Sequence, residues 1–117
     1  MGNPIRNEAG FMAVMFVYVT ASGAEEAERI ARAVVADRLA ACANVLAQVR
    51  SIYWWQGALE EGSEAALILK TTRERLADLI ARVKALHSYE CPCIEAFEVT
   101  DGNPDFLAWV ARETDNS

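Results

Sequence analysis

The amino-acid sequence predicts an α+β sandwich, in which one antiparallel sheet carries helices on a single face. The chain has 117 residues, enough for one domain and too few for two. Its apolar residues follow strand spacing or helix spacing in the order strand, helix, strand, strand, helix, strand, helix. This order contains two split βαβ units, which indicates the ferredoxin-like arrangement.

The first unit is a strand followed by a helix. Residues 12–20 are rich in β-branched and aromatic side chains, and both alternating sets are mainly apolar, which is typical of a strand covered on both faces. A capping box of Ser22 and Glu25 predicts the start of an amphipathic helix that ends near Ala40. Because two helices cover only one face of such a sheet, we expect a second copy of the protein to cover the other face.

The second unit begins with two strands. Residues 42–55 predict an unusually long strand with an aromatic far end, and residues 64–71 predict the next strand. Residues 56–63, with two glycines and several acidic residues, predict the turn between them. A second capping box, Thr71 with Glu74, predicts the start of another amphipathic helix.

The chain is predicted to close with a strand and a short helix. Residues 94–100 form the fourth strand, and Asn103 is the N-cap of a helix whose first turn contains Pro104. We therefore expect a disordered N-terminal extension, one domain and a frayed tail, at residues 1–11, 12–114 and 115–117.

Composition and charge exclude several classes of partner. The formal net charge is −6, so the chain lacks the basic excess that nucleic acids and anionic membranes attract. No run approaches the ~20 apolar residues of a membrane span. Three cysteines are an odd number without a secreted-type framework, which favours a soluble protein in a reducing cytoplasm.

The strongest chemical signal is the segment 87–93, which holds the only histidine and two of the three cysteines. Imidazole and thiolate groups are the ligands of soft or borderline metal ions. The predicted metal ligands are His87, Cys91 and Cys93, for copper as Cu(I) or for zinc. In an extended strand, Cys91 and Cys93 would point to the same face. The alternative is that both cysteines, like Cys42, pack as small apolar residues while His87 bonds a helix carbonyl.

A second candidate site combines aromatic side chains with a few polar groups, as small-molecule pockets do. Its residues are Tyr53, Trp54, Trp55, Lys70, Tyr89 and Glu90. Alternatively, the aromatic residues anchor a subunit interface, where tryptophan and tyrosine are enriched. An ammonium group in an apolar strand needs a partner, and Glu90 is the expected partner of Lys70. No phosphate loop, serine elbow or metal-hydrolase motif is present, so we do not expect an enzyme.

Four segments in order resemble the CutA divalent-cation tolerance family. They are LAACAN at 39–44, SIYWWQG at 51–57, LILKTT at 67–72 and LHSYECP at 86–92. The resemblance extends over residues 16–111. It implies a ferredoxin-like subunit in a tight homotrimer, related in architecture to PII-type signalling proteins, and an association with copper and other divalent metals. Two residues depart from the family pattern, because Ser88 and Cys93 replace its usual proline and glutamate.

The resemblance and the segment 87–93 together favour one function. We expect a cytoplasmic trimer involved in tolerance or response to copper and other divalent metal ions, which binds rather than catalyses and needs no obligatory cofactor. The alternative is a PII-like regulatory or scaffolding trimer that binds a small molecule or a protein partner in clefts between its subunits.

Overall fold

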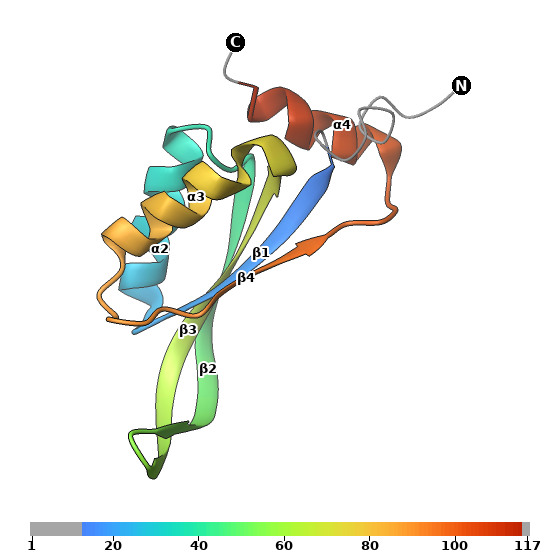
Figure 1. The fold of residues 1–117 in the computed structure, drawn as a ribbon. Coiled ribbons are helices and arrows are strands. Elements are labelled where there is room, and N and C mark those ends of the chain that lie inside the picture. Colours follow the sequence, from blue (N-terminus) through green and yellow to red (C-terminus); the bar gives the residue numbers. More distant parts are fainter. Residues whose placement is uncertain (1–12, 116–117) are drawn as a thin grey trace.

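The computed structural model describes residues 13–115 (Figure 1). Its elements are β1 (Val14–Ala21), α2 (Ala24–Ala36), β2 (Cys42–Trp55), β3 (Ala58–Thr72), α3 (Arg73–Leu86), β4 (Ile94–Glu98) and α4 (Pro104–Glu113). The predicted extension at 1–11 lies outside the described residues, and so do the last two residues of the predicted tail.

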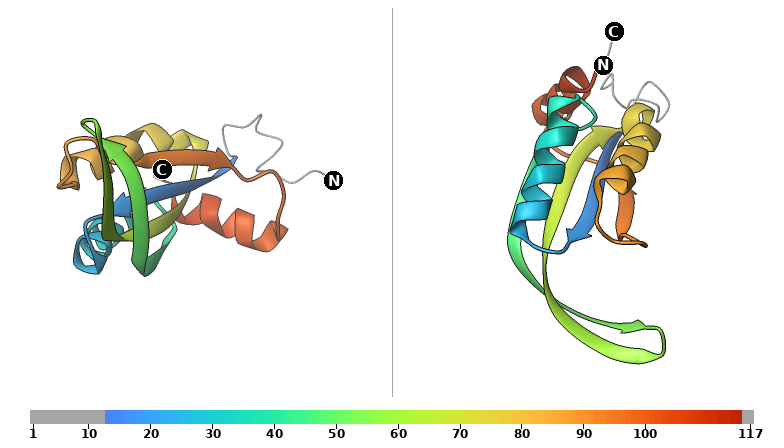
Figure 2. Two further views of the ribbon diagram at one scale, coloured as in Figure 1. Left: turned by 90° about the horizontal axis from the view of Figure 1, so that it is seen from below. Right: turned by 90° about the vertical axis from the view of Figure 1, so that its left-hand side faces the viewer.

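The four strands form one antiparallel sheet in the order β2-β3-β1-β4. Helices α2 and α3 cover the same face of the sheet, while the far part of the β2–β3 hairpin extends away from both (Figure 2). The α+β class and the ferredoxin-like order predicted from the sequence are therefore confirmed. Helix α4 lies at the end of the sheet opposite to the hairpin tip (Figure 1).

The core lies between the sheet and the two helices. Val17 on β1 stands opposite Leu69 on β3 and Ala96 on β4, and the first two of these side chains are fully buried. Ile30 of α2 and Leu79 of α3 complete this layer without any exposed surface. Alternation along β1 thus sends every second side chain into the core, as the apolar pattern predicts.

Neither predicted capping box forms. Helix α2 has Gly23 as its N-cap, and Glu26 rather than Glu25 reaches back, so that its Oε1 accepts the backbone N–H of Ser22 at 2.9 Å. At α3, the hydroxyl of Thr71 donates instead to the carbonyl of Leu39 at 2.7 Å. Both predicted boxes were therefore wrong, because a different glutamate reaches back at α2 and the Thr71 hydroxyl has a distant partner at α3.

The N-cap predicted for the last helix is confirmed. The Asn103 side chain accepts the backbone N–H of Asp105 at 3.1 Å, and Pro104 occupies the first turn of α4. Val14, Leu107 and Val110 form a small second core that holds this helix against β1.

The predicted turn at 56–63 is wrong. The turn consists of Gln56 and Gly57 alone, with φ of 49° and 83°, and Trp55 pairs directly with Ala58. Positive φ at both central residues is the requirement of a type I′ hairpin turn. Strand β3 therefore begins at Ala58, six residues earlier than predicted, and the hairpin extends beyond the core.

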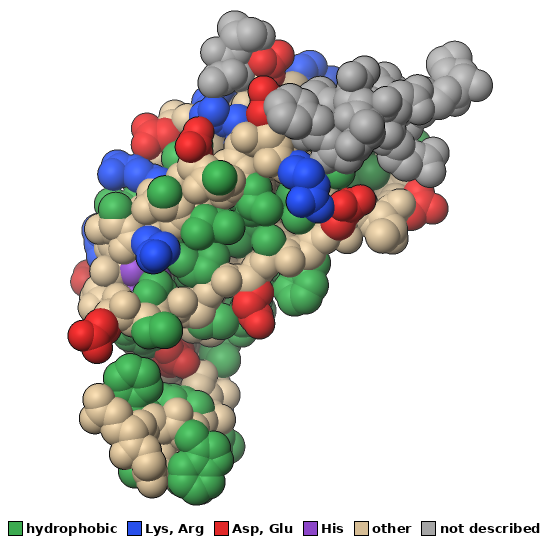
Figure 3. All heavy atoms as spheres, in the orientation of Figure 1, with side chains coloured by type: hydrophobic (Ala, Val, Ile, Leu, Met, Phe, Trp, Pro, Cys, Tyr) green, Lys and Arg blue, Asp and Glu red, His purple; other side chains and the backbone are tan. Residues whose placement is uncertain are grey.

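The hairpin and the open face of the sheet carry exposed apolar side chains. The large ones are Leu46, Ile52, Tyr53, Trp54, Trp55, Leu59 and Phe97, and Phe106 on α4 is also exposed. Figure 3 shows such side chains gathered along the projecting hairpin. Phe16 and Tyr18, on the second face of β1, are only half-buried. Among the described residues, no helix is long and apolar enough to cross a membrane.

Candidate functional site

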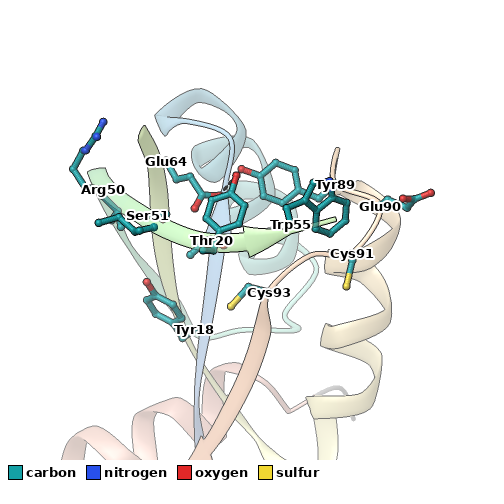
Figure 4. A pocket seen from close by; sticks show the side chains of 13 residues that line it. Tyr18, Thr20, Arg50, Ser51, Trp55, Glu64, Tyr89, Glu90, Cys91 and Cys93 are labelled. Atoms are coloured by element: carbon teal, nitrogen blue, oxygen red, sulfur yellow. Dashed lines mark hydrogen bonds between the residues drawn. The ribbon is translucent and has the colours of Figure 1, made fainter. Parts of the chain in front are cut away.

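A hollow of about 670 Å³ lies between the β2–β3 hairpin and the loop that leads into β4 (Figure 4). Its lining residues are Tyr18, Thr20, Val49, Arg50, Ser51, Ile52, Tyr53, Trp55, Glu64, Tyr89, Glu90, Cys91 and Cys93. A β-bulge between Leu46 and Val49 interrupts the register of the hairpin just before the lining begins. Such bulges bend a strand, so the hairpin curves over the open face of the sheet and creates the hollow.

The imidazole of His87 is fully buried and fixes the loop beside the hollow. Its Nδ1 accepts the backbone N–H of Tyr89 at 3.0 Å, and its Nε2 lies 2.7 Å from the carbonyl oxygen of Thr20. A ring whose Nδ1 accepts must carry its proton on Nε2, and this proton is donated to the carbonyl. Both ring nitrogens of His87 are therefore occupied by contacts within the chain.

A second buried group, Glu26, holds the same loop from the side of α2. Its carboxylate is 7% exposed and accepts the backbone N–H of Ser22 at 2.9 Å and of Ser88 at 2.7 Å. Burial by itself raises the pKa of this carboxyl group. The hydrogen bonds from Ser22 and Ser88 have the larger, opposite effect, and the pKa falls from 4.5 to about 2. Glu26 is consequently ionised at neutral pH and ties α2 to the start of the loop.

Tyr89 connects the loop to the hairpin. Its hydroxyl donates to Oε2 of Glu64 on β3. Burial and the neighbouring Glu64 carboxylate raise the pKa of the phenol well above its usual value, so the hydroxyl remains a donor at neutral pH.

Cys91 and Cys93 both line the hollow as free thiols, the first exposed and the second half-buried. They precede β4, which begins at Ile94, so the strand geometry expected for the pair is absent. Burial, and then the nearby Glu95 carboxylate, raise the pKa of the Cys93 thiol. The two side chains extend from neighbouring positions of one loop (Figure 4).

The structure does not bring His87 together with the two thiols as a ready metal site. Its ring nitrogens are engaged elsewhere, and across residues 13–115 no three His, Cys, Asp or Glu side chains are placed to hold one metal ion. Metal binding by Cys91 and Cys93 stays a prediction.

The second candidate set is divided by the fold. Tyr53, Trp55, Tyr89 and Glu90 line the hollow, whereas Trp54 and Lys70 do not. Successive side chains of a strand point to opposite faces, so Trp54 points away from the face that carries Tyr53 and Trp55. Its side chain is 73% exposed.

The expected pairing of Lys70 with Glu90 is wrong. The Lys70 ammonium lies 2.9 Å from Oδ1 of Asn44 and 5.9 Å from the ring centroid of Phe16, on the open face of the sheet. Half-buried Cys42 stands opposite Lys70 on β2. A neighbouring amide and an aromatic ring take the place of the predicted carboxylate, because β2 and β1 flank Lys70 at this position.

Sequence reasoning missed several residues that shape the site. Tyr18 and Thr20 lie on the second face of β1, and the alternation of that strand could have identified them. Glu64 was assigned to the start of a strand beside an acidic turn that was expected to be a solvated loop or a weak site for hard cations, and its contact with Tyr89 was not predicted. Glu26 carries no local signal, because one of its partners, Ser88, lies 62 residues away in the sequence.

The fold and the hollow together define a small ferredoxin-like α+β domain with a ligand-sized hollow beneath a projecting hairpin. Residues 15–113 match the model of the family described as CutA1 divalent ion tolerance protein, and the chain belongs to this family. The divalent-cation tolerance protein CutA of Archaeoglobus fulgidus is 44% identical over 81% of this chain and 92% of that protein. The protein of the same description from Thermus thermophilus is 43% identical over 84% of this chain and 95% of that protein.

Solved structures show the same fold. The crystal structure of CutA from Xylella fastidiosa superposes with a TM-score of 0.86 at 37% identity, covering 88% of this chain and 99% of that one. The structure of the Archaeoglobus fulgidus protein, described as periplasmic, superposes with a TM-score of 0.84 at 41% identity, covering 87% and 99%.

Proposed function

We propose that this protein takes part in tolerance or response to copper and other divalent metal ions, and that it acts in the cytoplasm by binding rather than by catalysis. Membership of the CutA1 family supports the relation to divalent ions. The observation that carries the binding function is the pair of free thiols, Cys91 and Cys93, on one wall of the hollow. Thiolates are the ligands that Cu(I) and zinc prefer.

The residues present fit a soft ion better than a hard one. Cys91 and Cys93 are two positions apart, and the exposure of Cys91 leaves a path for an incoming ion. Binding would release the thiol protons, because the thiolate is the ligand form. His87 could join only after Nδ1 gives up the N–H of Tyr89, so we place the ion on the two sulfurs first.

The test is a competition titration of the fully reduced protein with Cu(I) and a strong chelator. We expect about one equivalent per chain, and an affinity at least about tenfold lower when both cysteines are changed, Cys91→Ser with Cys93→Ser, since serine removes the soft ligands. Cys42→Ser is the matched control because Cys42 is also half-buried but lies outside the hollow. An equal loss in the control, or no loss in the double variant, would contradict the site.

We also propose that the protein is a homotrimer. The exposed apolar side chains of the hairpin, with Ile52 at 65% and Leu59 at 58%, form a surface larger than scattered apolar residues explain. Light scattering should give three times the 12.9 kDa of one chain. The double variant Ile52→Glu with Leu59→Glu should lower this mass, because charges are unfavourable in the centre of an interface. A single-chain mass for the unmodified protein would refute the assembly.

The hollow favours a second candidate function, a PII-like regulatory or scaffolding trimer with a ligand in clefts between subunits. Its aromatic and polar lining has the composition of a small-molecule site. Loss of the cellular metal phenotype in the double cysteine variant would support metal handling. Loss of cellular metal tolerance in Trp55→Ala, with the cysteines intact, would support the regulatory function.

A further inference from the structure

Besides the two thiols, the hollow contains aromatic side chains and the Glu64 carboxylate, to which the proposed metal site assigns no role. We propose that the hollow binds an organic ammonium cation, meaning a quaternary or alkylated amine, with the charge near Glu64 and the alkyl groups against the aromatic wall. This inference does not depend on metal binding, because neither Cys91 nor Cys93 takes part, and it names a ligand class for the small-molecule function proposed for the same hollow.

Four aromatic side chains contribute to the wall. Tyr18, Tyr53, Trp55 and Tyr89 all line the hollow, from β1, from the hairpin and from the loop before β4. Figure 4 shows Trp55 and Tyr89 together on one side and Tyr18 on another. The negative faces of such rings attract cations, and groups of rings recognise quaternary ammonium ligands in this way.

One carboxylate of the hollow, Glu64, has no cationic partner among the described residues. The Glu64 side chain is half-buried. Its partner is the neutral hydroxyl of Tyr89, which donates to one of its two oxygens. A carboxylate removed from water in this way is stabilised by a positive charge, and an ammonium ligand would supply that charge.

Other classes of ligand fit less well. An organic anion would need a free cation, but the guanidinium of Arg50 pairs with Glu61 at 3.0 Å and points away from the hollow (Figure 4). A hard metal ion needs several oxygen ligands. The Glu90 carboxylate also points outward, which leaves Glu64 as the only carboxylate directed inward among the residues labelled there (Figure 4).

The charge can be tested separately from the shape. Isothermal titration of the full chain with choline is compared with 3,3-dimethyl-1-butanol, in which carbon replaces the charged nitrogen. We expect saturable binding of choline that is at least about fivefold tighter than that of the neutral alcohol, as cation–π attraction at a partly exposed site would give.

Two variants locate the binding. Trp55→Ala and Glu64→Gln should each weaken choline binding about five- to tenfold, by removing a ring face or the charge. The Glu64→Gln substitution is not expected to disturb the fold, because a glutamine carbonyl can still accept the Tyr89 hydroxyl. Phe106→Ala is the control, an exposed aromatic residue on α4 at the far end of the molecule, and should leave binding unchanged.

Three results would overturn the inference. These are equal affinity for choline and for the neutral alcohol, absence of saturable choline binding, and unchanged choline affinity in Glu64→Gln. If Trp55→Ala alters the mass of the assembly, its effect on choline binding is not specific to the hollow, and the choline affinity of Glu64→Gln decides the test. A failed Cu(I) titration would not touch the inference, because that experiment reports on the thiols alone.

Discussion

Replacing Ile30 by alanine is expected to lower the free energy of unfolding by about 3 kcal/mol. Ile30 lies in the middle of α2 and has no exposed surface. It fills the layer between the helices and the sheet, together with Leu67 and Leu79. The loss has two sources, the apolar surface no longer buried and the cavity that a packed core cannot close.

The helix itself does not explain such a loss, because alanine has the higher intrinsic helix propensity. Arg32→Ala in the same helix is the matched control, since its side chain is 82% exposed and its ion pair with Glu28 is long, at 3.9 Å. We expect that variant to stay within about 0.5 kcal/mol of the unmodified protein. Chemical denaturation at one protein concentration measures both. Similar values for the two variants would show that Ile30 is not a core residue.

The apolar periodicity that identifies Ile30 also predicted most of the fold. Wherever an element buries one face in the same chain, its pattern is regular, and β1, α2 and the start of β2 were predicted to within a few residues or better. The far half of the hairpin buries neither face on this chain. Apolar and polar residues around Gly62 therefore do not alternate regularly, and the segment resembles a loop in sequence although it pairs as a strand.

The candidate site shows a similar division. Side chains that line the hollow from neighbouring positions, such as Tyr89 and Cys91, were identified because they are close in the sequence. The partners of His87 and Lys70 were not, because hydrogen bonding to Thr20 or Asn44 depends on how distant segments meet. A lone histidine beside two cysteines indicates a metal site by residue type, whereas the folded chain uses its ring to fix a loop.

The second large effect concerns Glu26 and the pH dependence of stability. The pKa of its carboxyl group is lowered from 4.5 to about 2 in the folded chain, where burial opposes the shift and the hydrogen bonds from Ser22 and Ser88 outweigh it. The folded state therefore binds this proton less readily than the unfolded state. The resulting stability is fully present above pH 4.5 and is lost as the pH falls towards 2. At 1.36 kcal/mol for each pKa unit, it amounts to about 3 kcal/mol.

Glu26→Gln should accordingly be less stable than the unmodified protein by about 3 kcal/mol at pH 7, and the difference should nearly disappear at pH 2. Denaturant titrations between pH 7 and pH 2 measure the difference at each pH, so that other carboxyl groups cancel. Glu28→Gln, on the exposed side of the same helix with its side chain 55% exposed, should differ by less than about 0.5 kcal/mol throughout. A Glu26→Gln difference that is independent of pH would mean that the buried carboxylate contributes shape and not charge, and that the loop at Ser88 is held by other contacts.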